Sequence, residues 1–294
     1  MIVLTGTSGG LAGVVLDTIL DKKLLPPSSF RISSSSNTIS ARANEAGIEV
    51  RYGDMTKPET LLQSFADADL ISGFISIAKA AGVQHVIYTS LTFGGPTGDQ
   101  TIAGVMKAHV ETVRYLKASG LSWTIVRQAT YAHLWNLFAG FLQLEGNGDC
   151  DVVIPYGGPN SWASRDDLGE ATAVIVSRWH DYVGQTVNLT GPRLLNVEEI
   201  IELYSKYTGR HVNVRVVEAT KAIEHHRVHK TLPPEQEEFL PNWASWYDAM
   251  ASGETDYLDP TLEQLLGRKP QDIQDMEAAL FTGKTNILDT KDFV

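Results

Sequence analysis

The chain has few of the residues that mark secreted, membrane-spanning or nucleic-acid-binding proteins. Its single cysteine, Cys150, excludes a disulfide within the chain and fits a reducing compartment. Lysine and arginine number 24 against 35 aspartates and glutamates, and the resulting formal net charge of −11 disfavours nucleic acid or an anionic membrane as a partner. No apolar run approaches membrane-spanning length, and no basic segment of a secretion signal precedes the first apolar residues. We therefore expect a soluble, cytoplasmic protein.

Apolar residues, in contrast, are plentiful and recur in short runs. The 294 residues are enough for one large domain or for a domain with a smaller partner, and at 43% hydrophobic content a sizeable core can form. Runs that predict buried strands lie at 1–5, 30–33, 48–52, 85–91 and 121–127. Stretches with helical spacing lie between them, at 11–25, 39–46, 58–65 and 101–119. This alternation predicts an α/β fold with a doubly wound parallel sheet.

The segment between Asp69 and Gln84 is short for such a fold. It has room for one helix, at 73–81, and little more, whereas a crossover between two parallel strands takes roughly 10–12 residues or more. We expect the sheet to be shortened around its fourth strand. It either lacks that strand or keeps a stub of it at 68–71.

A turn of small residues directly follows the first predicted strand. Gly6 can adopt the backbone angles of a sharp turn, Gly9 keeps side chains away from a ligand, and the small Ala12 lets the helix pack on the strand. A glycine turn between a strand and a helix is typical of dinucleotide binding, because the helix N-terminus offers N–H groups to the phosphates. A glycine turn in some other α/β domain is the alternative. The residues predicted to hold the cofactor here are Gly6, Thr7, Ser8, Gly9, Gly10, Leu11 and Ala12.

The end of the second predicted strand carries hydroxyl and amide groups but no acid. An aspartate or glutamate there would bind the ribose 2′-hydroxyl of NAD(H) and repel a 2′-phosphate. Ser34, Ser35 and Asn37, with Arg31 nearby, tolerate that phosphate, so the sequence favours NADP(H) over NAD(H) as the cofactor. The alternative is that the serine run is a flexible polar loop.

Two further strand ends supply predicted contacts to the cofactor. Asp54 and Met55 follow the third strand, where an adenine ring is commonly held in such folds. Ser90 and Leu91 end the fifth strand, close to the expected position of a nicotinamide. We therefore predict that the dinucleotide lies across the carboxyl ends of the strands.

The helix predicted at 101–119 has a histidine on its apolar face. His109 shares a stripe with Ile102, Val105, Met106, Val113 and Leu116. This position is compatible with a half-buried histidine of the core, and also with a proton donor beside the cofactor. The chain has no Tyr-x-x-x-Lys sequence, so the usual pair that protonates a carbonyl oxygen in short-chain dehydrogenases is missing.

Aromatic side chains crowd the segment after the sixth predicted strand, at 128–141. Tyr131 and Trp135 either form a flat wall for an aromatic substrate or are core residues beneath a lid. Farther along, His225 and His229 would share one face of a helix. Because no H-E-x-x-H sequence or paired cysteines accompany them, we predict a solvated helix and no metal site.

Four segments of the chain occur together in one known family. They are TGTSGGLA at 5–12, YTSLTFGG at 88–95, VMKAHVETVRYLKASGLSWTIVR at 105–127 and DPTLEQLLGRKP at 259–270. Together they resemble the NmrA-like family of atypical short-chain dehydrogenases/reductases, above all its fungal members and its NAD(P)H quinone oxidoreductases. The resemblance implies a Rossmann-type NAD(P)-binding domain, 1–150, and a smaller α/β C-terminal substrate lobe, 151–294, interleaved with it. It also implies NADP(H) at the turn from Gly6 to Ala12, with the substrate cleft between the two parts.

The same resemblance bears on the helix histidine. It places the histidine of the family at His109, in a His-x-x-Thr-x-x-x-Leu pattern completed by Thr112 and Leu116. Val113 departs from the family, which usually has glutamate at that position. The segment at 69–84 departs as well, because the family has a longer one whose loop contacts the nicotinamide half.

Two functions fit these residues. The first is reduction of a quinone or aromatic carbonyl by hydride transfer from NADPH; a quinone accepts hydride readily, so a strong proton donor is less necessary. In this hypothesis His109 polarises or protonates the acceptor, Ser90 and Thr92 line the catalytic site, and Tyr131 and Trp135 form a wall for the substrate. The second is a non-catalytic protein that binds NAD(P)H and acts as a redox-sensing regulator. Neither hypothesis predicts the oligomeric state.

Overall fold

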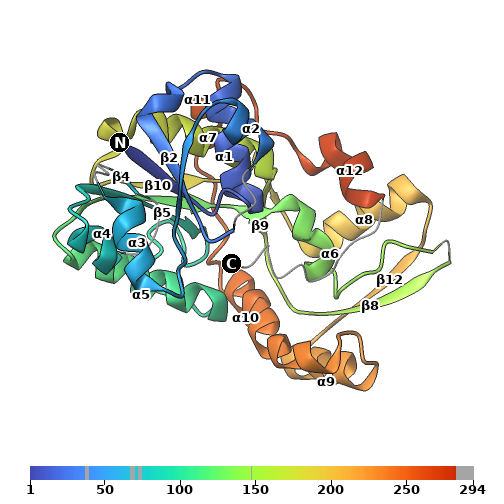
Figure 1. Ribbon diagram of the computed structural model, residues 1–294. Helices are drawn as coiled ribbons and strands as arrows, with labels where there is room; N and C mark the ends of the chain where they lie inside the picture. The colour runs from blue at the N-terminus through green and yellow to red at the C-terminus, as the bar shows by residue number, and fades with distance from the viewer. Residues whose placement is uncertain (37–39, 67–69, 72–74, 147, 283–294) are drawn as a thin grey trace.

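Seven parallel strands form the main sheet of the computed structural model, which describes residues 1–36, 40–66, 70–71, 75–146 and 148–282 (Figure 1). Their order across the sheet is β10-β6-β5-β4-β1-β2-β3, and every neighbouring pair is parallel. The first six strands thus follow the doubly wound Rossmann order, which confirms the predicted fold class. The strands are β1 (Ile2–Thr5), β2 (Phe30–Ser34), β3 (Glu49–Tyr52), β4 (Leu70–Ile71), β5 (His85–Leu91), β6 (Ser122–Gln128) and β10 (Thr186–Leu189).

The fourth strand is the stub that the short interval allowed. β4 pairs with β1 on one side and with β5 on the other. The residues beside it, 67–69 and 72–74, lie outside the described part of the chain. One helix follows, α4 at Ile75–Ala80, as the length of the interval predicts.

Helices cover both faces of this sheet (Figure 1). Neighbouring residues of a strand point to opposite faces, so Ile2 and Leu4 pack on one side and Val3 packs on the other. One face is covered by α1 (Gly10–Asp21), α2 (Ala41–Glu45), α7 (Arg165–Ser177) and α11 (Thr261–Leu266). The opposite face is covered by α3 (Pro58–Phe65), α4 and α5 (Gly104–Ala118). None of the helices in the described ranges is both long and apolar enough to cross a membrane.

A second group of elements, here called the lobe, lies beside the main sheet (Figure 1). It contains a parallel pair, β8 (Cys150–Pro155) and β12 (Val212–Val217), and a sheet of β7 (Thr130–Tyr131), β9 (Asn160–Ala163) and β11 (Leu194–Leu195). Its helices are α6 (Trp135–Phe138), α8 (Val197–Thr208), α9 (Ala219–Val228), α10 (Leu240–Ala251) and α12 (Glu277–Phe281). Between β9 and β11 the chain returns to the main sheet, where β10 pairs with β6. Short 3₁₀ helices lie at Pro27–Ser29, Ala132–Leu134, Trp179–Tyr182, Pro234–Phe239 and Ile273–Met276.

Aromatic side chains build the core of the lobe. Trp135 is 1% exposed, packs edge-on against Phe281 and donates from Nε1 to the carbonyl of Leu280 at 3.0 Å. Trp243 donates in the same way to the carbonyl of Leu137, also at 3.0 Å. Trp135 is therefore a core residue, which was one of the two interpretations of the aromatic segment.

Helix α5 begins later than its apolar pattern predicts, because Glu254 holds the chain in front of it. The Glu254 carboxylate accepts from the hydroxyl of Thr101 and from the N–H of Ile102, both at 2.6 Å. The helix starts only at Gly104. Ile102 was expected on the buried stripe, but it is 49% exposed, so that prediction was wrong; Val110 is buried instead.

Candidate functional site

The glycine turn lies at the carboxyl end of β1, where the strand order reverses between β1 and β4. Open α/β sheets bind ligands at such a point. Gly6 has a φ of +70°, which favours glycine, and its carbonyl accepts a hydrogen bond of 2.8 Å from the N–H of Gly9. A Cβ on Gly9 would lie 3.2 Å from the same carbonyl oxygen, so this tight turn needs small residues.

The first turn of α1 is open to an anion. Gly9 is its N-cap, no side chain among the described residues caps the helix, and its first turn contains no acid. The leading N–H groups therefore have no side-chain acceptor, and the positive end of the helix dipole lies at the same place. Thr7 is half-buried and Ser8 is exposed on this turn, while Leu11 and Ala12 are half-buried in the helix. A phosphate or diphosphate fits this arrangement.

The serines at the end of β2 form a turn of their own. Ser34 Oγ accepts from the N–H of Ser36 at 3.1 Å and donates to the carbonyl of the same residue at 3.2 Å. Ser35 is exposed, and Asn37 lies outside the described residues. This strand end thus presents hydroxyl groups to a ligand.

Arg31, which the sequence placed near these serines, is bound elsewhere. Its guanidinium donates to the carbonyl of Ala66 at 2.8 Å and pairs with Glu49 at 3.2 Å. The residue is 3% exposed. Arg31 therefore holds the C-terminal end of α3.

Asp54 shapes the turn after β3. Its carboxylate accepts from the hydroxyl and the N–H of Thr56, at 2.7 and 2.9 Å, and these bonds hold its pKa below the usual value. Tyr52 donates to the same carboxylate at 3.1 Å. Met55 is half-buried and packs against the apolar cluster beneath α3 and α4. The turn that borders the predicted adenine position is thus fixed by an ionised carboxylate.

His109 pairs with a tyrosine that the sequence analysis did not single out. Tyr88 Oη and His109 Nδ1 lie 2.8 Å apart, and the ring centroids lie 5.7 Å apart. Burial lowers the pKa of His109 and raises the pKa of Tyr88, so both side chains are neutral at pH 7. Tyr88 and Ser90 are two residues apart on β5 and share one face of the strand. The structure thus brings His109 to the strand face that also carries Ser90, which is 3% exposed.

Arg127, at the end of β6, holds the loop that follows β5. The residue is 2% exposed. Its guanidinium donates to the carbonyls of Leu91 at 3.1 Å, Phe93 at 2.6 Å, Gly95 at 2.9 Å and Pro96 at 2.8 Å. The half-buried Leu91 and the backbone after it are therefore held in one arrangement before any ligand binds.

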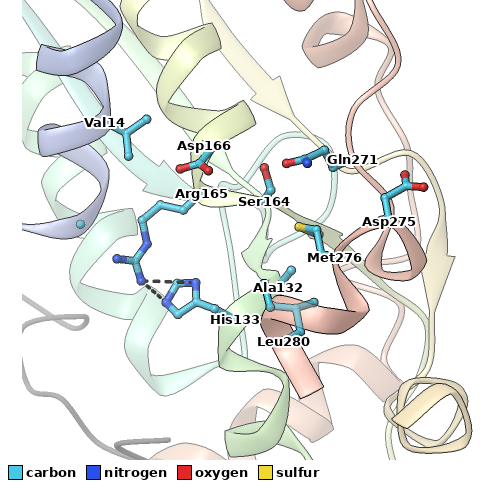
Figure 2. A pocket seen from close by; sticks show the side chains of 12 residues that line it. Val14, Ala132, His133, Ser164, Arg165, Asp166, Gln271, Asp275, Met276 and Leu280 are labelled. Carbon is cyan, nitrogen blue, oxygen red and sulfur yellow. Dashed lines mark hydrogen bonds between the residues drawn. The ribbon is translucent and has the colours of Figure 1, made fainter. Parts of the chain in front are cut away.

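Tyr131, His133 and Arg165 form a cluster beside the start of α1. The rings of Tyr131 and His133 stack with centroids 5.7 Å apart, and the Arg165 guanidinium carbon lies 5.7 Å from the centroid of the Tyr131 ring. Arg165 also hydrogen-bonds the imidazole of His133 (Figure 2). Burial, and then the charge of Arg165, lower the pKa of His133 to about 4, so this ring is neutral at pH 7. The sequence predicted only Tyr131 here, because folding alone brings α7 beside the segment after β6.

A cavity of about 440 Å³ adjoins this cluster (Figure 2). It lies between α1, the start of α7 and the segment that leads into α12. Its lining includes Gly10, Val14, His133, Arg165, Met276 and Leu280. The carboxylates of Asp166 and Asp275 line it as well, so apolar side chains and charged groups of both signs border the first turn of α1.

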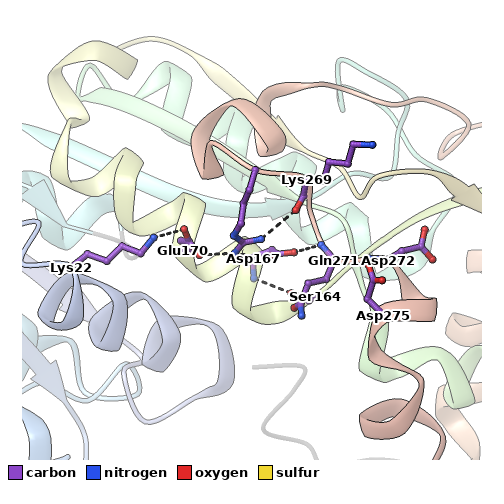
Figure 3. A network of polar contacts seen from close by, with 9 residues as sticks. Lys22, Ser164, Asp167, Glu170, Lys269, Gln271, Asp272 and Asp275 are labelled. Carbon is purple, nitrogen blue, oxygen red and sulfur yellow. Dashed lines mark hydrogen bonds and ion pairs between the residues drawn. The ribbon is translucent and has the colours of Figure 1, made fainter.

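A polar network fixes the start of α7 (Figure 3). Ser164 caps the helix by accepting the N–H of Asp167 at 2.9 Å. The buried Asp167 carboxylate accepts from the N–H of Gln271 at 2.6 Å and pairs with Arg268 at 2.8 Å. These contacts set the position of Arg165, which is the first residue of the helix.

His225 in α9 and His229, the residue that follows the helix as its C-cap, lie close together, as their spacing predicts. Their ring centroids are 4.0 Å apart, and His229 Nδ1 lies 2.8 Å from the carbonyl oxygen of His225. Within the residues that the structure describes, no group of three or more His, Cys, Asp or Glu side chains is placed to hold a metal ion.

Two curated proteins are similar to this chain over much of their length. The NmrA-like family domain-containing oxidoreductase flvB of Aspergillus flavus is 27% identical over 286 residues, which cover 91% of this chain and 90% of that protein. Quinone oxidoreductase 2 of Escherichia coli is 29% identical over 230 residues, which cover 72% of this chain and 76% of that protein.

Solved structures show the same fold. The NADPH complex of the Escherichia coli quinone oxidoreductase has a TM-score of 0.80 at 22% identity, over 96% of this chain and 100% of that one. The NADP(H) complex of Citrobacter sp. triphenylmethane reductase has a TM-score of 0.76 at 22% identity, over 95% of this chain and 99% of that one. The model of the NmrA-like family matches residues 1–278. The chain therefore belongs to the NmrA-like family, which confirms the resemblance in its motifs.

Proposed function

We propose that this protein is an NADPH-dependent oxidoreductase that reduces a quinone or an aromatic carbonyl by hydride transfer. The observation that carries the proposal is the open first turn of α1, which follows a glycine turn at the point where the strand order reverses. The serines at the end of β2 support NADP(H) over NAD(H), because hydroxyl groups tolerate a 2′-phosphate that a carboxylate would repel.

The names of the relatives also support an oxidoreductase that uses NADPH. One curated relative is an oxidoreductase, and another is a quinone oxidoreductase. Two structural neighbours were crystallised with NADPH or NADP(H). By their names, one of these two proteins reduces quinones and the other reduces triphenylmethane compounds. We propose a quinone or another aromatic compound as the electron acceptor of this chain.

The residues of this chain bind and orient the reactants. The cofactor, when bound, supplies a hydride from its nicotinamide ring. The N–H groups of α1 hold its diphosphate, and the hydroxyls of Ser34 and Ser35 accommodate the 2′-phosphate. Ser90 and Leu91 line the nicotinamide end, and Tyr131 forms one wall for the acceptor.

His109 is the proposed source of a proton for the reduced oxygen. If Tyr88 donates to His109 Nδ1 across their 2.8 Å contact, the neutral ring carries its own proton on Nε2. A proton passed from Nε2 to an acceptor oxygen would be replaced at Nδ1 by the proton of the Tyr88 hydroxyl, and the tyrosinate left behind would take up a proton from solvent, which is the net source of the proton. This pair would take the place of the missing Tyr-x-x-x-Lys, with a weaker donor that a readily reduced quinone tolerates.

Two measurements on the purified protein test the proposal. The first is a titration with NADPH and with NADH, followed by the fluorescence of the six tryptophans, and tighter binding of NADPH is expected. The second is steady-state oxidation of NADPH with a panel of quinones and aromatic carbonyls, and turnover of a quinone is expected. Binding without turnover of any acceptor would favour a redox-sensing regulator, and absence of binding would overturn both functions.

A further inference from the structure

The segment that joins α10 to α11, residues 252–260, crosses from the lobe to the main sheet and is here called the crossing segment. On its way it binds the carboxyl ends of two strands of that sheet. Tyr257 Oη donates to the carbonyl of Thr92, directly after β5, at 3.2 Å. The N–H of Asp259 donates to Thr190 Oγ1, directly after β10, at 2.8 Å. The crossing segment therefore lies at the edge of the sheet where the dinucleotide is proposed to bind.

Within the crossing segment, Glu254 binds both ends of the loop between β5 and α5. Its backbone carbonyl accepts a hydrogen bond of 2.8 Å from the N–H of Gly95, near the start of the loop. Its carboxylate accepts two more at the end of the loop, from Thr101 Oγ1 and from the N–H of Ile102, both at 2.6 Å. Hydrogen bonds to a carboxylate are stronger than those between neutral groups, so Glu254 fixes the end of the loop firmly.

The loop itself is closely packed and has little freedom to adjust. Gly94 has a φ of +89°, and a Cβ on it would lie 2.6 Å from the carbonyl oxygen of Gln100. The guanidinium of Arg127 binds carbonyls at the start of the loop, and a Cβ on Gly98 would lie 2.7 Å from its Cζ. A displacement at the end of the loop is therefore passed on to the start of α5, because the loop cannot absorb it.

Helix α5 depends on acceptors that other elements supply. Its N-cap is Ala103, which has no side-chain acceptor, and residues 104–107 include no acid. The N–H groups in front of the helix and at its start are bound by Glu254 and by Ser245 Oγ, which lies in α10 of the lobe. A carboxylate at this place also complements the positive end of the helix dipole. His109 lies in the second turn of α5, so the position of its ring follows from where the helix starts.

We infer that Glu254 is a positioning residue, whose carboxylate holds the start of α5 so that His109 meets Tyr88 in the geometry that proton transfer requires. The inference rests on the proposed function, because it takes His109 as the group that gives a proton to the acceptor. The contact to be kept is the one of 2.8 Å between His109 Nδ1 and Tyr88 Oη. A displacement of roughly 1 Å at such a group lowers a rate by up to about hundredfold, so a carboxylate outside the site affects the chemistry.

Glu254→Gln tests this role by activity. The variant keeps the shape of the side chain and one oxygen, but its amide turns an N–H toward one of the two donors that the carboxylate bound. We expect kcat for a quinone to fall about threefold to tenfold, because α5 shifts. The Kd for NADPH should stay within about twofold, because the diphosphate is proposed to bind at α1. An unchanged kcat would overturn the inference.

A double-mutant cycle distinguishes positioning from a general loss of structure. In a His109→Ala protein, adding Glu254→Gln is expected to lower kcat by less than about twofold, because no proton donor is left to be misplaced. If the two changes instead lower kcat by the product of their separate effects, Glu254 acts through another part of the molecule and the inference is wrong.

The neighbouring residue provides a matched control. Thr255 is 1% exposed, and its Oγ1 donates to the carbonyl of Pro159 in the lobe at 2.7 Å. Thr255→Val removes a buried hydrogen bond from the same crossing segment, so it should lower the melting temperature while kcat stays within about twofold. Equal losses of kcat in Thr255→Val and Glu254→Gln would contradict a specific role for the carboxylate.

A spectroscopic measurement decides the inference without turnover. The nitrogen NMR signals of the His109 ring report the hydrogen bond at Nδ1, and Tyr88→Phe marks their position when that bond is lost. We expect Glu254→Gln to move these signals part of the way toward that position, and Thr255→Val to leave them in place. If the unmodified protein oxidises NADPH with none of the acceptors, the proposed function fails, and the ring signals still decide the role of Glu254. Signals that Glu254→Gln leaves unchanged would overturn the inference.

Discussion

Helices α1 and α7 lie side by side and run in the same direction, yet their first turns are built in opposite ways. Gly10 meets Arg165, and one turn later a Cβ on Gly169 would lie 2.4 Å from a side-chain carbon of Val14. α7 begins with the side-chain cap of Ser164 and has two acids in its first turn, whereas α1 has neither among the residues that the structure describes.

The start of α7 thus stabilises the folded protein, whereas the start of α1 is left to bind a ligand. Caps and acids at a helix start satisfy N–H groups and complement the dipole, and together contribute about 1 kcal/mol or more. In α7 the cap and the acids belong to the protein itself, so their contribution to stability is present without a ligand. α1 leaves its N–H groups for an external anion, so part of its stabilisation is available only when a ligand is bound. The predictions below, from the largest expected effect to the smallest, test this division.

Acidification is expected to give the largest effect, because it acts on the packed interior and on the open end of α1 together. Burial lowers the pKa of His85, of His133 and of His226 to about 4 each. The unfolded chain, with a histidine pKa of about 6.5, binds protons that the native state excludes between these values, so stability falls from pH 7 to pH 5 by roughly 1–2 kcal/mol for each histidine. Urea unfolding at pH 7, 6 and 5 measures this. His133→Gln should remove one histidine's share of the pH dependence, and a stability that does not fall toward pH 5 would contradict the assignment.

The closed turn of α7 is expected to matter for stability. Asp167→Ala removes the acceptor of the Gln271 N–H and the partner of Arg268, and should lower the free energy of unfolding by about 2–3 kcal/mol. The matched control is Asp166→Ala, an exposed acid in the same turn, with an expected change of at most about 0.5 kcal/mol. Equal losses for the two variants in chemical denaturation would refute a special role for the buried carboxylate.

The open turn of α1 is expected to matter for binding. Gly9→Asp gives α1 the kind of cap that α7 has, and puts a negative charge where the diphosphate is proposed to lie. The Kd for NADPH should rise about hundredfold, or ~2.7 kcal/mol, while the ligand-free protein keeps its stability to within about 1 kcal/mol. Ser164→Ala should do the reverse, with a loss of about 1 kcal/mol in stability and an unchanged Kd. A Gly9→Asp protein that binds NADPH as tightly as the unmodified protein would show that the diphosphate does not bind at the first turn of α1.

The smallest effect is expected in α5, whose start is closed by other means. Ser245 Oγ accepts from the N–H of Gly104 at 2.8 Å, so the lobe supplies an acceptor that the helix itself lacks. The start of α5 is not a proposed site for the diphosphate, so His109→Ala should leave NADPH affinity unchanged. It should lower kcat for a quinone by about tenfold, which is the contribution of a modest proton donor. Tyr88→Phe should shift the pH profile of kcat with a smaller loss. A full retention of kcat in His109→Ala would make that histidine a structural residue.

The sequence predicted the elements whose causes are local. The strand at 85–91 and the helix at 58–65 have the predicted bounds, because hydrophobic period and an initial proline determine them. The glycine turn could also be predicted, since the φ of +70° at Gly6 is a property of one residue. The family resemblance followed from the same local segments.

The contacts that complete the site could not be predicted, because they join distant parts of the chain. Arg165 reaches His133 and Gly10 only after α7 has packed on α1, and nothing in the sequence of either segment specifies that meeting. Trp135 was open to two interpretations because aromatic content alone does not distinguish a core from a wall. Helix α5 starts late because Glu254 binds its leading residues from far along the chain.

The return of the chain to the main sheet at β10 has a further consequence. The backbone leaves the sheet after β6, builds β8 and β9, and comes back to pair with β6 before it continues into α8. Neither part of the molecule can melt without breaking hydrogen bonds that belong to the other. Calorimetry should therefore record a single cooperative transition whose enthalpy matches the van't Hoff value, and a fragment cut between the two parts should fail to accumulate as folded protein.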